Sequence, residues 1–234
     1  ALLPLVEAKS HEAWHNEFKE KYKIELESVI NDELNPKGEG ISMGETIEMI
    51  NKHSNGDAIM VSDVGQHQMF TCRYSKFNQS KSNITSGGLG TMGFALPAAI
   101  GAKMGQPDRE VVAIIGDGGF QMTIQELGTI FQTRVPVKIV VLNNEFLGMV
   151  RQWQQLFFDK RYASTEMINP NFIAIAEGYY IKAKKVTKRE DLDAAVAEML
   201  ASKEAYFLEV MVEKENNVFP MIPTGASVSD IRLS

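Results

Sequence analysis

Short apolar segments alternate with helix-like segments through most of this chain, and this alternation constrains its fold more than any other feature. Four runs rich in Val and Ile have the length of a strand: 58–62, 111–115, 137–142 and 207–212. They are apolar at successive positions, so both faces of each strand must be covered. Helical patterns fill the intervals between them. We therefore predict an α/β fold, with a mostly parallel central sheet and helices on both faces.

The remaining segments complete the expected order of elements. A charged helix over about 10–30 carries an apolar stripe and ends in the breaker cluster 35–40. Ser42, followed three residues later by Glu45, is typical of a capping box that opens a helix to about His53. Further helices are expected up to about Met104 and over 121–133, 148–158, 170–177 and 189–202, with a strand near 180–186. We expect a connector over 1–40, one domain over 41–213 and an extended tail over 214–234.

Composition excludes several classes of protein. The chain has 24 Lys and Arg against 30 Asp and Glu, a formal net charge of −6, which disfavours a nucleic-acid-binding surface. Its one cysteine, Cys72, cannot form an internal disulfide and fits a reducing compartment. No apolar run is long enough to cross a bilayer. We therefore expect neither nucleic acid nor a membrane as a partner.

Polar side chains follow three of the apolar runs, at the strand ends where open α/β sheets bind ligands. Asp117 follows 111–115, Asn143-Asn144 follows 137–142, and the segment 63–67 follows the first run. Asp117 and Asn144 are 27 residues apart, about the length of a strand, a crossover helix and a returning strand. Both strand ends should therefore lie at one edge of the sheet.

Carboxylate and amide oxygens at such an edge are the ligands that Mg²⁺ prefers. Gly118 and Gly119 permit close backbone approach, and a helix beginning near Gln121 would direct its amide groups to the same place. Mg²⁺ between protein oxygens and a diphosphate is the natural occupant, because one carboxylate does not balance the cation alone. The alternative is that both motifs are ordinary turns, with Asp117 as a helix cap.

A second alternative is a dinucleotide site, because residues 88–93 match the pattern G-x-G-x-x-G. The context disfavours it. Residues 78–83 are polar rather than a buried strand, and no acidic residue closes a second strand about 20 residues later. The glycines indicate instead a backbone that comes close to a ligand or to another helix.

The motifs resemble those of a known family. Gly-Asp-Gly at 116–118, 24 intervening residues and then Asn143-Asn144 are similar to the thiamine diphosphate motif of the decarboxylase and carboligase superfamily. Gly-Gln-His-Gln-Met at 65–69, Ser-Gly-Gly-Leu-Gly-Thr-Met-Gly at 86–93 and Gly-Met-Val-Arg-Gln-Trp-Gln at 148–154 narrow the resemblance to one branch. This branch is the large, catalytic subunit of acetohydroxyacid (acetolactate) synthase, and the resemblance is to its C-terminal cofactor-binding domain.

The resemblance implies which residues contact thiamine diphosphate. Gln66 and His67 would contact the diphosphate together with the amides of Gly118 and Gly119, and Met92 would support the two rings in a bent conformation. The full set that it implies is Val64, Gly65, Gln66, His67, Gly90, Met92, Gly116, Asp117, Gly118, Gly119, Met122, Asn144, Phe146, Leu147, Gly148, Met149 and Val150. Without the resemblance, His67 would be a capping or satisfied loop histidine, and the methionines ordinary core residues.

The implied Mg²⁺ ligands are Asp117, Asn144 and the backbone carbonyl of Phe146. Related sequences often carry an acidic residue at the last position, and a carbonyl ligand tolerates the difference. Met149, Val150 and Trp153 would line the substrate channel; a core aromatic on an amphipathic helix is the alternative for Trp153. No catalytic residue is expected in this chain, because the activating glutamate of such enzymes lies in a separate N-terminal domain.

The implied reaction is decarboxylation of pyruvate on thiamine diphosphate and condensation with a second 2-keto acid, in branched-chain amino-acid biosynthesis. The chain begins at Ala1 without Met. We therefore expect a piece of a longer protein. The resemblance implies that its other domains include a middle domain holding FAD, and that the piece alone is inactive. Expected partners are those domains, further copies in a homodimer or homotetramer, and a regulatory small subunit.

The expected location is the cytoplasm in a bacterium, with an organellar transit peptide not excluded. One alternative function is a domain of another thiamine diphosphate enzyme, a catabolic acetolactate synthase or a different carboligase or decarboxylase. The other is a non-catalytic module that binds a nucleotide or an anion.

Overall fold

The computed structural model describes residues 3–7 and 9–234 of the chain. The described residues form two compact units. The larger unit is Glu33–Val218, and the smaller one combines the described part of residues 1–32 with Phe219–Ser234. All the motifs that the sequence analysis selected lie in the larger unit. The expected boundaries at 40/41 and 213/214 stay a prediction.

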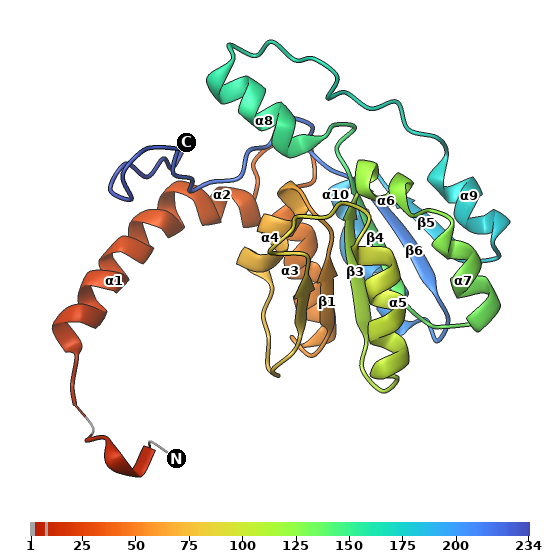
Figure 1. Cartoon of the computed structure of the whole chain (residues 1–234), viewed down its shortest axis with the longest axis horizontal. Coiled ribbons are helices and arrows are strands. Elements are labelled where there is room, and N and C mark those ends of the chain that lie inside the picture. Colours follow the sequence, from red (N-terminus) through yellow and green to blue (C-terminus); the bar gives the residue numbers. More distant parts are fainter. Residues whose placement is uncertain (1–2, 8) are drawn as a thin grey trace. The chain divides into compact units, whose positions relative to one another are not determined.

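A six-stranded sheet forms the centre of the larger unit (Figure 1). Its strands are β1 (Ile59–Ser62), β2 (Asn83–Thr85), β3 (Val111–Gly116), β4 (Lys138–Asn143), β5 (Lys182–Val186) and β6 (Tyr206–Met211). Their order in the sheet is β2-β1-β3-β4-β6-β5, and every neighbouring pair is parallel. Every residue of β1, β3 and β4 is buried, as strands that are apolar on both faces require. The α/β fold class predicted from the apolar runs is confirmed.

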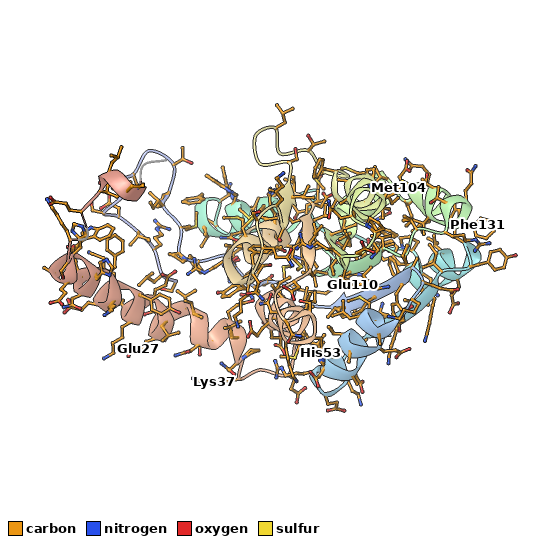
Figure 2. The ribbon with its side chains drawn as sticks, turned by 90° about the horizontal axis from the view of Figure 1, so that it is seen from below. Glu27, Lys37, His53, Met104, Glu110 and Phe131 are labelled. Atoms are coloured by element: carbon orange, nitrogen blue, oxygen red, sulfur yellow. The ribbon has the colours of Figure 1, made fainter. Side chains whose placement is uncertain are left out.

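Helices cover both faces of this sheet (Figure 1). On one face lie α3 (Met43–Ser54), α4 (Gln66–Tyr74) and α10 (Arg189–Ala201); on the other lie α5 (Ala95–Gly105), α7 (Glu126–Thr133) and α9 (Phe172–Gly178). Alternate strand residues such as Val111, Ala113 and Ile115 enter the core beneath α5, α7 and α9. Met104 of α5 and Phe131 of α7, labelled in Figure 2, lie on the exposed side of their helices. None of the helices in the described ranges combines the length and the hydropathy of a membrane span.

The order of the strands reverses beside β1. The chain leaves β1 through α4 to reach β2 on one side, and it returns through α5 to β3 on the other side. The two connecting helices lie on opposite faces of the sheet, so the loops that follow β1 and β3 diverge and leave an opening between them. A position of this kind is where open α/β sheets bind ligands.

Several elements differ from those expected. A helix, α6 (Asp117–Met122), begins directly after β3, and residues 123–125 separate it from α7; a single helix over 121–133 was predicted. The break coincides with Thr123, whose hydroxyl donates to the carbonyl of Gly93. Helix α4 and the edge strand β2 were not predicted, because neither has a clear apolar period. Helix α8 (Gly148–Phe157) agrees with its prediction.

The smaller unit has two parts that are far apart in the sequence. Near the N-terminus, a 3₁₀ turn over Leu3–Leu5 precedes α1 (Glu12–Glu25), which continues through a π-helical stretch over Leu26–Ile30 into α2 (Asn31–Leu34). The ring centroids of Trp14 and Phe18 lie 4.7 Å apart, in agreement with the predicted apolar stripe. At the other end, Met221 and Arg232 form an antiparallel bridge. The tail therefore turns back on itself, where an extended tail was predicted.

Candidate cofactor site

A cavity of about 290 Å³ opens at the carboxyl ends of β1, β3 and β4. Most of the residues predicted to bind a cofactor line it. They are Val64, Gly65, Gln66, His67, Gly90, Met92, Gly118, Gly119, Asn144, Phe146, Leu147, Gly148, Met149 and Val150. Met43, Gln68, Met69 and Leu142 also line it and were not predicted. The place and the wall of the cavity thus agree with the motif analysis.

Four other predicted residues lie outside the lining. Gly116 lies behind the ring of His67, and Asp117 is buried with only 1% of its surface exposed. Met122 is 55% exposed on the outer side of α6, next to Gly93. Trp153 packs its ring against Phe157, with centroids 4.9 Å apart. The predictions for Met122 and Trp153 therefore stay without support from this geometry.

Gly118 and Gly119, which follow β3, pack their backbone closely against neighbouring side chains. A Cβ atom on Gly118 would lie 2.8 Å from Cδ2 of Leu147, and one on Gly119 would lie 2.6 Å from Oδ1 of Asp63. A side chain on Gly118 would require the Leu147 side chain to shift, whereas one on Gly119 would meet a carboxylate that is held by three hydrogen bonds. Helix α6 consequently begins with its backbone, rather than side chains, next to the cavity. Gly65 on the facing loop has φ +146°, a value that favours glycine.

Asp63 holds the Gly-rich loop in place. Its carboxylate is fully buried and accepts hydrogen bonds from the backbone N–H groups of Val64 (2.9 Å), Gly93 (3.0 Å) and Ala95 (2.9 Å). These bonds join the end of β1 to the loop before α5, which places Gly90 and Met92 at the cavity. Asp63 is one of the polar residues that follow the first apolar run, and its sequence context alone does not indicate this role.

His67 is buried, and its Nε2 atom has no hydrogen-bond partner within the described residues. Its ring packs against Gly65 and Gly116, since a Cβ on either glycine would lie 2.9 Å from Cε1. Burial lowers the pKa of the imidazole to about 4, against an opposing effect of the nearby Asp63 carboxylate. The ring is therefore neutral at pH 7. The residue lies in the first turn of α4 with a ring nitrogen unpaired among the described residues, so it is not a satisfied loop histidine; the alternative of a capping histidine stays open.

The register of β3 and β4 brings their polar ends to the same level. Gly116 pairs with Leu142, so the next residues, Asp117 and Asn143, are opposite each other. The amide of Asn169 donates to both, to Oδ2 of Asp117 (2.7 Å) and to Oδ1 of Asn143 (3.1 Å). Burial raises the pKa of Asp117 to about 6, although the Asn169 hydrogen bond acts in the opposite direction.

The side chain of Asn144 is directed to Gln66 of α4. Its Nδ2 atom lies 3.4 Å from Oε1 of Gln66, and its Oδ1 accepts from the backbone N–H of Phe146 at 3.2 Å. Gln66 is in turn held by Gln152, with 2.9 Å between the amide nitrogen and the amide oxygen. Asp117 is therefore connected through Asn169 to Asn143, whereas Asn144 makes its side-chain contact with the amide pair Gln66 and Gln152.

These features fit a bound diphosphate with a divalent cation. His67, Gly118 and Gly119 line the cavity, and Nε2 of His67 has no partner within the described residues. The buried Asp117 carboxylate lacks a cationic side-chain partner among its hydrogen bonds. The described residues contain no group of three His, Cys, Asp or Glu side chains arranged for a metal. A metal here would need amide or carbonyl oxygens, which Asn144 and Phe146 provide at the cavity wall.

Comparisons with known proteins agree on one family. Residues 63–210 match the family described as "Thiamine pyrophosphate enzyme, C-terminal TPP binding domain". The chain is 43% identical over 195 residues to acetolactate synthase isozyme 2 large subunit of Escherichia coli K12, a match that covers 83% of this chain and 36% of that protein. It is 42% identical over 229 residues to acetolactate synthase 1, chloroplastic, of Nicotiana tabacum, covering 94% of this chain and 33% of that protein.

A solved structure supports the fold. The thiamine diphosphate-dependent 4-hydroxybenzoylformate decarboxylase of Rhodococcus jostii RHA1 is similar with a TM-score of 0.70 and 27% identity. That match covers 76% of this chain and 34% of the decarboxylase. The chain thus spans about a third of the length of the proteins that it matches.

Proposed function

The chain belongs to the family of C-terminal TPP-binding domains of thiamine pyrophosphate enzymes, and on this premise we propose that it is the cofactor-binding domain of an acetolactate synthase large subunit. The observation that carries the proposal is the cavity where β1, β3 and β4 end. Gly118 and Gly119 line this cavity together with His67, which has a ring nitrogen without a partner in the described residues, and the buried Asp117 precedes the two glycines in the chain. The sequence similarity to acetolactate synthases supports this enzyme over other members of the family.

The chain's own residues would hold the diphosphate and its cation. His67 and Gln66 of α4 would contact the phosphates, and the backbone of Gly118 and Gly119 in the first turn of α6 would bind them as well. Asp117, Asn144 and the carbonyl of Phe146 would hold Mg²⁺ through oxygen atoms, as a hard cation requires. A neutral His67 can donate one hydrogen bond to a phosphate oxygen without carrying charge at pH 7.

When bound, thiamine diphosphate supplies the nucleophile and the electron sink for decarboxylation of a 2-keto acid. Met92, Met149 and Val150 give the cavity an apolar wall, which would exclude water and orient the rings of the cofactor. We expect the carboxyl group that assists proton transfer to be a glutamate from an N-terminal domain of the complete enzyme.

The complete protein would then contain two further domains, one of which supplies the glutamate while the other holds FAD. Its substrates would be pyruvate and a second 2-keto acid, and its partners further copies of itself and a regulatory subunit. It would function in the cytoplasm of a bacterium or inside an organelle. The coverage of about a third of each relative supports the proposal of further domains.

Calorimetry on the chain tests the binding role. Thiamine diphosphate should bind in the presence of Mg²⁺ and not in the presence of EDTA, and Asp117→Ala should abolish the binding. Asp108→Ala is the matched control, because Asp108 is exposed and lies outside the cavity. Binding that survives Asp117→Ala, or a preference for a nucleotide over thiamine diphosphate, would support the non-catalytic module instead.

Product analysis tests the enzyme. The protein from the complete reading frame should convert pyruvate to acetolactate and should require FAD, while the 234-residue chain with thiamine diphosphate and Mg²⁺ should form none. Acetolactate formation without FAD would favour a catabolic enzyme. Turnover of an aromatic 2-keto acid in preference to pyruvate would favour a decarboxylase similar to the one from Rhodococcus jostii.

A further inference from the structure

Asn169 is the residue that connects the two strand ends of the site, and it lies in a segment to which the sequence analysis gave no role. Its neighbours Ile168 and Pro170 are exposed, whereas its own side chain is turned towards the sheet. One nitrogen atom donates to Asp117 and to Asn143, at 2.7 and 3.1 Å. Gln121 donates to the amide oxygen at 2.9 Å, which keeps the NH₂ group directed at Asp117.

The segment 165–169, which we call the strap, also organises the loop that carries Phe146. The N–H of Leu147 donates to the carbonyl of Thr165 (2.8 Å), and the N–H of Met167 donates to the carbonyl of Glu145 (2.9 Å). In an antiparallel pair of this kind, the residue between the bonded ones directs its own N–H and C=O away from the partner segment. The backbone polar groups of Phe146 therefore point away from the strap, and its N–H meets Asn144.

The side-chain nitrogen of Asn143 is also held in place, by a residue of β6. Its Nδ2 donates to Oε1 of Glu209 at 2.8 Å, and Lys185 pairs with the same carboxylate at 3.1 Å. Glu209 is 2% exposed on β6, so this ion pair anchors the network in the sheet. Asn143 cannot turn without breaking bonds on both sides, which leaves Asn169 held between two fixed groups.

We propose that Asn169 is a positioning residue for the Mg²⁺ site, which holds the Asp117 carboxylate in place through its amide while the strap presents the carbonyl of Phe146. This inference rests on the proposed function. Partners that orient the ligands of a metal typically contribute about 10- to 100-fold to metal affinity. Asn169 would contribute in this way without touching the metal, because both of its polar atoms already have protein partners.

The test compares Asn169→Ala and Asn169→Asp with Asn171→Ala. Asn171 is the matched control: it lies two residues away in the same connection, and its side chain caps α9 by accepting from the N–H of Ala174 at 3.1 Å. Asn169→Asp keeps the size of the side chain and replaces the donor with a second carboxylate next to Asp117. Melting curves of all three variants show whether each is folded and how much stability it has lost.

Mg²⁺ is titrated into each variant of the chain in the presence of excess thiamine diphosphate, and Mn²⁺ electron paramagnetic resonance reports the ligand arrangement. Both Asn169 variants should bind Mg²⁺ at least about tenfold more weakly and show an altered Mn²⁺ spectrum. Asn171→Ala should bind Mg²⁺ with wild-type affinity, even if its melting temperature falls as much as that of the Asn169 variants.

Wild-type affinity in both Asn169 variants, or equal weakening in Asn171→Ala, would overturn the inference while the proposed function stands. If the wild-type chain shows no Mg²⁺-dependent binding of thiamine diphosphate, the proposed function fails and this inference fails with it.

Discussion

Gly119 has no room for a side chain, and the reason is a residue far away in the sequence. A Cβ atom at this position would lie 2.6 Å from the Asp63 carboxylate, which already accepts three backbone hydrogen bonds. Asp63 cannot move aside without breaking them. Glycine is needed here so that α6 can begin beside the end of β1, and this contact brings two walls of the cavity together.

We expect Gly119→Ala to lower the free energy of unfolding by about 1–3 kcal/mol, because the added methyl group forces the buried carboxylate or α6 to shift. Gly101→Ala is the control. Gly101 lies inside α5, and apart from its own stretch of helix no atom of the described residues lies within 4 Å of its Cβ position, so alanine should raise stability by up to about 1 kcal/mol. Urea denaturation of both variants measures the difference. Equal changes in the free energy of unfolding of the two variants would contradict the close contact between Gly119 and the Asp63 carboxylate.

His67 should make stability depend on pH. Its pKa is lowered by burial to about 4, so below pH 6.5 the unfolded chain takes up a proton that the folded chain does not. Stability should fall as the pH drops from about 6.5 to about 4, by on the order of 3 kcal/mol, and this group has no effect above that window. Protonation of Asp117 has the opposite effect on stability. Its pKa is raised to about 6, so the folded chain takes up this proton at a higher pH than the unfolded chain does.

The difference between wild type and His67→Gln isolates the histidine. Urea denaturation at several values between pH 4 and 8 should give a steeper loss of stability in acid for wild type than for the variant. Parallel curves would show that His67 is protonated in the folded protein or that its burial is relieved in solution.

At the scale of elements, Asp63 joins three of them: the end of β1, the Gly-rich loop and the start of α5. The carboxylate accepts from Gly93 and Ala95 through different oxygens. An amide at this position has one oxygen, so one of those N–H groups would face an NH₂ group and remain unsatisfied. An unsatisfied buried donor costs about 1–3 kcal/mol.

Asp63→Asn should therefore lower the free energy of unfolding by at least about 1–3 kcal/mol and speed amide hydrogen exchange of residues 88–95. Asp108→Asn, at an exposed position in the turn before β3, should change neither quantity. Unchanged exchange in the Gly-rich loop of Asp63→Asn would mean that the loop is held by other contacts.

The elements that local pattern predicted correctly are those with a strong apolar period. The runs 111–115 and 137–142 lie within a residue of β3 and β4, and the capping box at Ser42 and Glu45 is present at the start of α3. Helix α4 and strand β2 were missed because α4 has a weak apolar stripe and β2 is short and partly exposed at the edge of the sheet.

The candidate site was predictable to the extent that motifs mark strand ends. The motif residues Gln66, His67 and Asn144 do line one cavity. Asn169 contacts Asp117, which is 52 residues away, and Asp63 contacts Gly93, which is 30 residues away. A local sequence pattern does not predict contacts between residues so far apart. The split between α6 and α7 was missed for the same reason, since it coincides with the bond from Thr123 to Gly93.

The larger unit exposes several apolar side chains. Leu89 is 92% exposed and Ile168 of the strap is 99% exposed, while Val150, which is 49% exposed, lines the cavity. Exposed apolar side chains of this size favour association with another protein surface. In the proposed enzyme, the surface would be that of the missing domains or of a second copy.

We expect the chain to self-associate at high concentration, and the double variant Leu89→Ser, Ile168→Ser to shift it towards the monomer. Met104→Ser is the control, because Met104 is 51% exposed near the end of α5, far along the helix from the cavity. Sedimentation velocity over a range of concentrations measures the change. A wild-type chain that stays monomeric at high concentration would contradict the expectation.

The most direct test of the account is a crystal structure of the chain grown with thiamine diphosphate and Mg²⁺. The diphosphate should lie between His67 and the backbone of Gly118 and Gly119. Mg²⁺ should lie at about 2.1 Å from oxygens of Asp117, Asn144 and Phe146. A cofactor bound outside this cavity, or a metal held without Asp117, would contradict the account.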